Sequence, residues 1–131
     1  TDTGASRGDI EQALQWIVAN AATFNIASVN LSLGSGNANG IATLELSDEF
    51  QALADLGVIV VTAAGNSFFT FGGRQGVSSI SADANTLSVG AVWDGDNGRR
   101  SFRSGAVDNT TGADRIISFS QRLPSIPHAR R

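Results

Sequence analysis

The first clear pattern along the chain is a helical spacing of apolar residues near its start. Residues at intervals of three and four fall on one face of an α-helix. The apolar positions are Ile10, Ala13, Leu14, Ile17, Val18 and Ala21. Asp9 is a favourable N-cap residue, and Gln12 three positions later predicts a capping box. Residues 20–25 are expected to end this helix.

Two apolar runs of strand length flank a second helical pattern. Residues 26–33 are rich in apolar and β-branched side chains and predict a strand that ends at Gly34. Residues 47–56 predict a helix, because Asp48 and Glu49 suit its positive end and Gly57 is a natural stop. Residues 58–64 form a continuous apolar run, which is typical of a strand buried on both faces of a parallel sheet.

The second half of the chain is less regular. Residues 86–92 predict a third strand, residues 94–98 a turn, and residues 99–119 a hairpin around residues 108–112. The order of helix, strand, helix, strand, loop and strand indicates an α/β fold with parallel strands joined by right-handed crossovers. In such folds, sites lie at the carboxyl ends of strands, here at Gly34 and Asn66.

Composition narrows the classes of protein that fit this pattern. The chain has 131 residues, which is one domain or part of one, and it is 41% hydrophobic and 16% charged, which excludes a disordered chain. The absence of cysteine excludes a disulfide framework, thiol catalysis and a Cys-ligated metal. A net charge of -3 does not favour nucleic acid as a partner, and no apolar run predicts a membrane span. Because methionine is also absent, we expect a piece of a longer protein or a processed product.

Three segments in a fixed order carry a family resemblance. Residues 29–34 read Val-Asn-Leu-Ser-Leu-Gly, residues 57–66 end in Ala-Ala-Gly-Asn, and residues 87–92 read Leu-Ser-Val-Gly-Ala-Val. In this order they resemble the subtilisin-like serine peptidases (subtilases, peptidase S8 family), and Phe-Ser-Gln-Arg at residues 119–122 resembles a later segment of that family. The resemblance covers about residues 9–122 of a single partial domain, 1–131, and residues 123–131 form a divergent tail. It implies a three-layer α/β fold with a mostly parallel sheet flanked by helices.

The resemblance also implies a site and an activity. Asn66 matches the asparagine whose side-chain amide stabilises the oxyanion of the tetrahedral intermediate in the family. The residues that match the strand pairing with substrate are Ser32, Leu33 and Gly34, and those that match a wall of the primary specificity pocket are Ala63, Ala64 and Gly65. The implied reaction is hydrolysis of a polypeptide substrate by acyl transfer to a serine, without a cofactor. Relatives often bind structural calcium through loop carbonyls, and a secreted or cell-surface location is typical of the family.

Two family motifs are missing from the sequence. The catalytic histidine of the family lies in a His-Gly-Thr motif and the serine in a Gly-Thr-Ser-Met-Ala motif, and the chain contains neither. We therefore expect the chain alone to be inactive, and the tail at residues 123–131 suggests truncation or a change of reading frame. The alternatives are a non-catalytic subtilisin-like binding module and a generic doubly wound α/β binding domain. The latter is weakened because no phosphate-binding loop occurs.

Four weaker candidates have simpler interpretations. Asp2, in an Asp-Thr-Gly tripeptide, is expected to lie in a loop before the first helix. The Arg-Gly-Asp tripeptide at residues 7–9 is explained by helix capping, and His128 by a solvated tail. The acidic residues of the 94–98 segment lack the rest of a calcium-binding loop and predict a polar turn. No metal site is therefore predicted.

Overall fold

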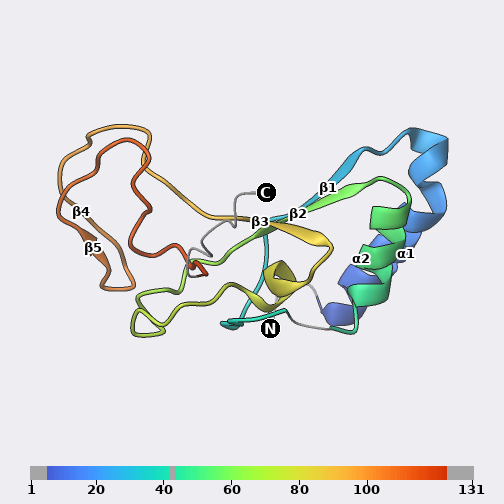
Figure 1. Cartoon of the computed structure of the whole chain (residues 1–131), viewed down its shortest axis with the longest axis horizontal. Coiled ribbons are helices and arrows are strands. Elements are labelled where there is room, and N and C mark those ends of the chain that lie inside the picture. The colour runs from blue at the N-terminus through green and yellow to red at the C-terminus, as the bar shows by residue number, and fades with distance from the viewer. Residues whose placement is uncertain (1–5, 42–43, 124–131) are drawn as a thin grey trace, which may run out of the picture.

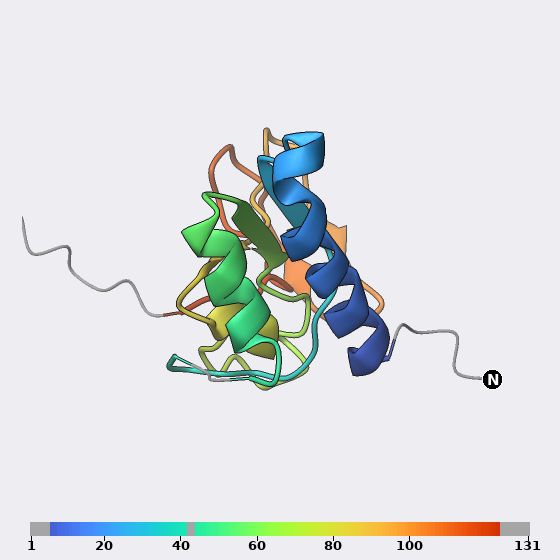
Figure 2. The same cartoon turned by 90° about the vertical axis from the view of Figure 1, so that its right-hand side faces the viewer.

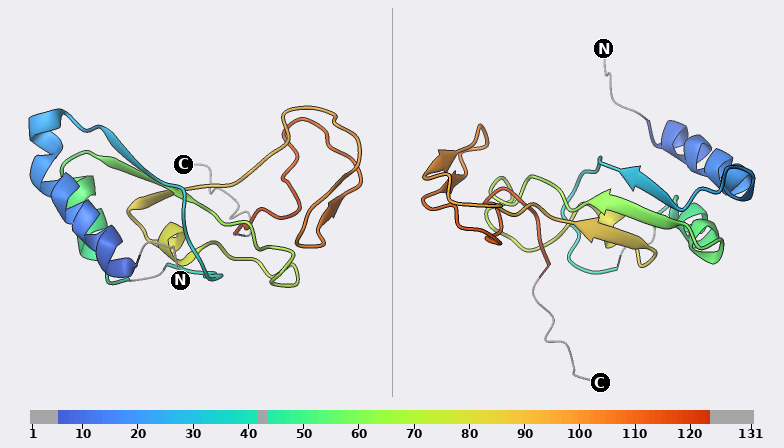
Figure 3. Two further views of the ribbon diagram at one scale, coloured as in Figure 1. Left: turned by 180° about the vertical axis from the view of Figure 1, so that it is seen from behind. Right: turned by 90° about the horizontal axis from the view of Figure 1, so that it is seen from above.

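The computed structural model describes residues 6–41 and 44–123, and it confirms the α/β prediction. Within these residues the helices and strands are α1 (Arg7–Phe24), β1 (Ser28–Leu31), α2 (Ser47–Asp55), β2 (Ile59–Ala63), η1 (Ser79–Ala82, a 3-10 helix), β3 (Thr86–Val89), β4 (Arg100–Ser101) and β5 (Val107–Asp108) (Figure 1). Strands β1, β2 and β3 form a parallel sheet with β2 in the centre. Figure 3 shows the three strands side by side, with the antiparallel β4–β5 pair in a separate lobe.

Both α-helices cover the same face of the sheet (Figure 2). Leu14 of α1 and Phe50 of α2 are completely buried and pack in one cluster with Val60 of β2. Val29 of β1 is the register partner of Val60 and packs against the same cluster. Each such buried side chain stabilises the fold by about 1.5–3 kcal/mol, so this cluster holds β1 and β2 in place under the helices.

The opposite face of the sheet is exposed within the described residues. Ile59 and Leu87 each retain 56% of their accessible surface, and Val89 retains 49%. The prediction that residues 58–64 form a strand buried on both faces is therefore wrong for this structure. The reason is that α1 and α2 pack on one side only, so the alternate side chains of β2 point to an uncovered face.

The N-cap of helix α1 lies three residues before the predicted one. Ser6, not Asp9, is the N-cap, and its hydroxyl accepts a hydrogen bond from the Asp9 backbone N–H at 3.2 Å. The Asp9 carboxylate in turn accepts from the Ser6 backbone N–H at 2.9 Å, which completes a capping box without Gln12. The Arg-Gly-Asp tripeptide thus lies in the first turn of α1, and Asn25, with φ of 52°, ends the helix.

The predicted hairpin has the wrong turn. Strands β4 and β5 are joined by residues 102–106, where the Phe102 N–H donates to the Ala106 carbonyl at 3.0 Å. Residues 108–112 do not turn back on themselves, because Thr111 is buried and donates to the Gly98 carbonyl at 3.0 Å. The short helix η1 was not predicted, and all three strands of the parallel sheet are shorter than their apolar runs.

The remaining weak candidates are placed as follows. The 94–98 segment is a polar turn in which Asp96 accepts from the Gly98 N–H at 3.0 Å. Asp2 and His128 lie outside the described residues. None of the helices in the described part of the chain has the length and apolar character needed to cross a membrane.

Candidate functional site

The carboxyl ends of β1 and β2 meet at the buried residue Ser78. Its hydroxyl donates to the Ala63 carbonyl at 2.7 Å, and its backbone N–H donates to the Ala64 carbonyl at 2.7 Å. On the other side, a Cβ atom built on Gly34 would lie only 2.6 Å from the Ser78 hydroxyl. Glycine is therefore required at position 34 for this approach. The structure thus brings Gly34, Ala63 and Ala64 together around a serine that the sequence analysis did not select.

The segment after β1 is open for pairing with another chain. Ser32, Leu33 and Gly34 are exposed, and β1 is an edge strand of the described sheet. Among the described residues, no hydrogen bond engages the backbone of Leu33 or Gly34. Unpaired N–H and C=O groups that continue an edge strand can add a further extended chain by backbone hydrogen bonds.

A cavity of about 330 Å³ opens beside this segment. Its walls come from four parts of the chain: the start of α1, the segment after β1, the approach to α2, and helix η1. The apolar residues that line it are Ile10, Leu33, Leu44, Leu46 and Ile80. A cavity with such walls beside an open edge suits an apolar side chain of an extended polypeptide.

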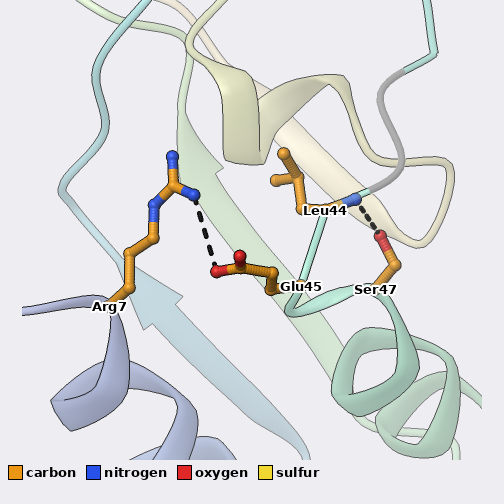
Figure 4. Close-up of polar contacts among 4 residues, drawn as sticks. All are labelled: Arg7, Leu44, Glu45 and Ser47. Atoms are coloured by element: carbon orange, nitrogen blue, oxygen red, sulfur yellow. Dashed lines mark hydrogen bonds and ion pairs between the residues drawn. The ribbon is translucent and has the colours of Figure 1, made fainter.

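Arg7 and Glu45 form an ion pair among the residues that line this cavity (Figure 4). The Arg7 guanidinium lies 3.6 Å from the Glu45 carboxylate, and both side chains are about three-quarters exposed. An exposed pair of this kind contributes only about 0–1 kcal/mol, so a ligand can displace it at little cost. The hydrogen bond from the Leu44 N–H to the Ser47 hydroxyl, 2.8 Å long, fixes the segment that carries Glu45.

Asn66 lies in an exposed bend just beyond β2. The preceding residue, Gly65, has φ of 108°, a conformation that favours glycine. The structure gives the Asn66 side chain no hydrogen-bond partner within residues 6–41 and 44–123. Its amide is thus exposed and available as a neutral donor at the end of a sheet strand.

The carboxylates with a shifted pKa lie outside this site. The pKa of Asp9 is lowered by its hydrogen bonds with Ser6, and the pKa of Asp48 is lowered mainly by a hydrogen bond involving Glu49. Neither carboxylate lines the cavity beside Leu33. No cluster of three or more His, Asp or Glu residues suited to a metal ion occurs within the described ranges. The chemistry offered here is therefore pairing with an extended chain and donation from a neutral amide.

Sequence reasoning missed two polar residues that organise the site. Ser78 joins the ends of β1 and β2, and Gln121 contacts the loops that follow both strands. Neither belongs to a motif that marks it. The glycines at positions 34 and 65 were the sequence feature that could have indicated these contacts. Glycine at a strand end often marks a close approach of another part of the chain.

Comparison with known proteins gives a consistent result. The family model described as "Subtilase family" (Peptidase_S8) matches residues 1–130. Among solved structures, one titled "S41 Psychrophilic Protease" is similar with 25% sequence identity and a TM-score of 0.61, and one titled "Sphericase" with 25% identity and a TM-score of 0.60. Each match covers 92% of this chain and 33% of the other chain. The chain therefore spans about a third of the length of these two solved structures.

Proposed function

This chain belongs to the subtilase family, and we propose that it supplies the substrate-binding cleft and the oxyanion donor of a serine endopeptidase. Membership of this family supports the function of a serine peptidase that acts on polypeptides. Because the chain spans about a third of the solved relatives, the activity of the whole protein is part of the proposal.

The observation that carries the proposal is the meeting of two strand ends at Ser78. On one side, the exposed residues Ser32, Leu33 and Gly34 extend an open edge strand, so an incoming polypeptide pairs with them through its backbone. Backbone pairing accepts many sequences, and the neighbouring 330 Å³ cavity then selects for an apolar side chain. On the other side, Ala63, Ala64 and Gly65 form a wall of the primary specificity pocket, and Ala64 also lines a second cavity of about 270 Å³.

The exposed amide of Asn66 supplies the proposed electrostatic step. When a nucleophile attacks the scissile carbonyl, negative charge develops on the carbonyl oxygen. A donor that is already in place stabilises this charge without reorganisation at the moment of reaction. A neutral amide suits the task because it donates a hydrogen bond and brings no negative charge of its own. The attacking serine and its base lie outside the role proposed for this chain.

The alternative is a subtilisin-like module that binds polypeptides without cleaving them. It shares the cleft with the enzyme and differs at the chemical step. A binding experiment tests the cleft for both functions, and kinetics on Asn66 variants tests catalysis alone.

The cleft can be tested on the chain itself by NMR. A blocked tetrapeptide amide, acetyl-Leu-Ala-Ala-Phe-amide, is titrated into the ¹⁵N-labelled chain. We expect chemical-shift changes at Ser32, Leu33, Gly34 and Ser35, since these residues pair with the peptide or line the cavity. The same peptide with N-methylated central amides is the control, because it cannot donate the pairing hydrogen bonds. Equal shifts with both peptides, or shifts confined to other residues, would contradict the proposed cleft.

A further inference from the structure

Gln121 is a buried polar side chain at the junction of three loops. Only 3% of its surface is exposed, although an uncharged amide of this size is usually solvated. Every polar atom of its side chain has a partner, since Oε1 accepts from the Ser67 N–H at 3.4 Å and Nε2 donates to the Gly36 carbonyl at 2.9 Å. Nε2 also donates to the Asn37 side-chain oxygen at 2.8 Å. A buried and fully paired amide fixes the groups that it contacts.

Gln121 holds the bend that carries Asn66 from both sides. Its backbone N–H donates to the Gly65 carbonyl at 2.8 Å, and its side chain accepts from Ser67. The next residue of the bend, Phe68, donates to the Phe119 carbonyl at 3.0 Å. Asn66 itself is exposed between these anchored neighbours. Because the Gly65 carbonyl and the Ser67 N–H are both bonded to Gln121, these contacts set the backbone position from which the Asn66 side chain extends.

The same side chain also reaches the loop that follows the substrate-pairing segment. Gly36 and Asn37, its two acceptors, come directly after Ser35, which lines the apolar cavity. The approach to the other loop is so close that a Cβ atom on Gly65 would lie 2.0 Å from the Gln121 oxygen. A single amide thus links the loop after β1 to the bend after β2, across 84 residues of sequence from Asn37 to Gln121.

We propose that Gln121 is a positioning residue, which fixes the Asn66 bend relative to the segment that pairs with substrate. This inference rests on the proposed function, because it concerns the residue to which we assign the oxyanion. Gln121 does not touch the reacting atoms in this role. It acts through Asn66, by restricting the backbone on both sides of it.

The first test uses the unaltered chain. In ¹⁵N-labelled protein, we expect the side-chain NH₂ hydrogens of Gln121 to exchange with water about tenfold or more slowly than those of Gln75, because buried and bonded groups are protected. Gln75 is the control because its side chain is exposed. Equal exchange rates would overturn the proposal, whatever the behaviour of any variant.

The second test compares Gln121→Ala with Gln51→Ala. Gln51 also makes side-chain hydrogen bonds, to Asp55 and Asn85, but on the exposed surface of α2. We expect Gln121→Ala to lower the backbone ¹⁵N heteronuclear NOE of Asn66 and the exchange protection of Ser67, while protection in α1 and α2 is unchanged. Gln51→Ala should leave the bend unaltered.

The outcomes separate positioning from general stability. A uniform loss of protection throughout α1, α2 and β2, or an unaltered bend in folded Gln121→Ala, would overturn the proposal. If Gln121→Ala does not fold, the exchange rates of the unaltered chain decide. Neither readout depends on catalysis, so their failure leaves the oxyanion role of Asn66 intact. Conversely, a failed kinetic test of Asn66 leaves the anchoring of the bend by Gln121 in place.

Discussion

Replacing Gly65 with alanine should destabilise the chain far more than the same change at Gly57. Both glycines have positive φ, 108° at Gly65 and 73° at Gly57. At Gly57 a new Cβ atom would meet no atom within 4 Å, so only the backbone conformation is penalised. That term is about 1–2 kcal/mol. Gly57→Ala therefore measures the conformational penalty by itself.

At Gly65 the new Cβ atom would lie 2.0 Å from the Gln121 oxygen, so that side chain must move. Its displacement breaks hydrogen bonds with Ser67, Gly36 and Asn37. At about 0.5–1.5 kcal/mol for each of these three bonds, and about 1–3 kcal/mol for alanine at the φ of 108° found here, the expected loss for Gly65→Ala is about 2.5–7.5 kcal/mol. The assay is urea-induced unfolding followed by circular dichroism, with both variants measured beside the unaltered chain.

A double variant identifies the source of the difference. In the Gln121→Ala background the atom that clashes is gone, so adding Gly65→Ala should cost only the backbone term of about 1–3 kcal/mol. If Gly65→Ala is already unfolded without urea while the double variant folds, the comparison gives a lower bound for the coupling. A steric conflict between Gly65 and Gln121 is ruled out if Gly65→Ala loses no more stability than Gly57→Ala, or if its penalty is the same with and without Gln121.

Three further predictions concern the core, the first helix and the chemistry of the isolated chain. Phe50→Ala should lose about 3–5 kcal/mol of unfolding free energy in urea, because Phe50 is fully buried, whereas Trp16→Ala, at a half-exposed position, should lose much less. The pKa of Asp9 in the folded chain lies below its ordinary value of 3.8, because the Ser6 hydroxyl and backbone N–H bind the carboxylate, so its stabilising effect is complete above that value and is lost as the pH falls through the lowered pKa. Circular dichroism from pH 7 to pH 2 should therefore show this acid-induced loss in the unaltered chain, and Asp9→Asn should lack that component. A fluorophosphonate probe labels a serine that is activated by a neighbouring base, usually a histidine. The only histidine of the sequence is His128, in the predicted solvated tail, so the isolated chain should stay unlabelled. Stoichiometric labelling of any serine would contradict this.

The sequence predicted the elements that are marked by a helical period or by a continuous apolar run. Helix α1 and strand β2 lie where their patterns placed them, because a stripe such as Leu14 to Ala21 is buried only by a helix at that position. The predicted hairpin turn at residues 108–112 is wrong because these turn-forming residues make a competing contact. Thr111 is buried against the Gly98 carbonyl, so the chain reverses at residues 102–106 instead.

Within the site, the sequence identified the strand ends and missed what joins them. Gly34, Gly65 and Asn66 are local features that punctuate an apolar run, so they stand out in the sequence. Ser78 and Gln121 are ordinary polar residues locally. Their importance comes from contacts with other segments of the chain, namely Gly34 and Ala63 for Ser78, and Gly36 and Asn37 for Gln121. Such contacts depend on the packed sheet and have no local pattern.

The proposed role of Asn66 is to donate to an oxyanion in a serine peptidase of which this chain would form part. Its most direct test is steady-state kinetics on a peptide anilide, with Asn66→Ala compared with the unaltered enzyme and circular dichroism to confirm the fold. Substrate binding relies on backbone pairing along Ser32, Leu33 and Gly34, so KM should change little, while the oxyanion exists only in the transition state. Asn66→Ala should lower kcat by about 10²–10³-fold, the magnitude known for an oxyanion donor of this family. A kcat within about threefold of the unaltered enzyme, which is less than roughly 0.7 kcal/mol, would show that Asn66 is only a turn residue.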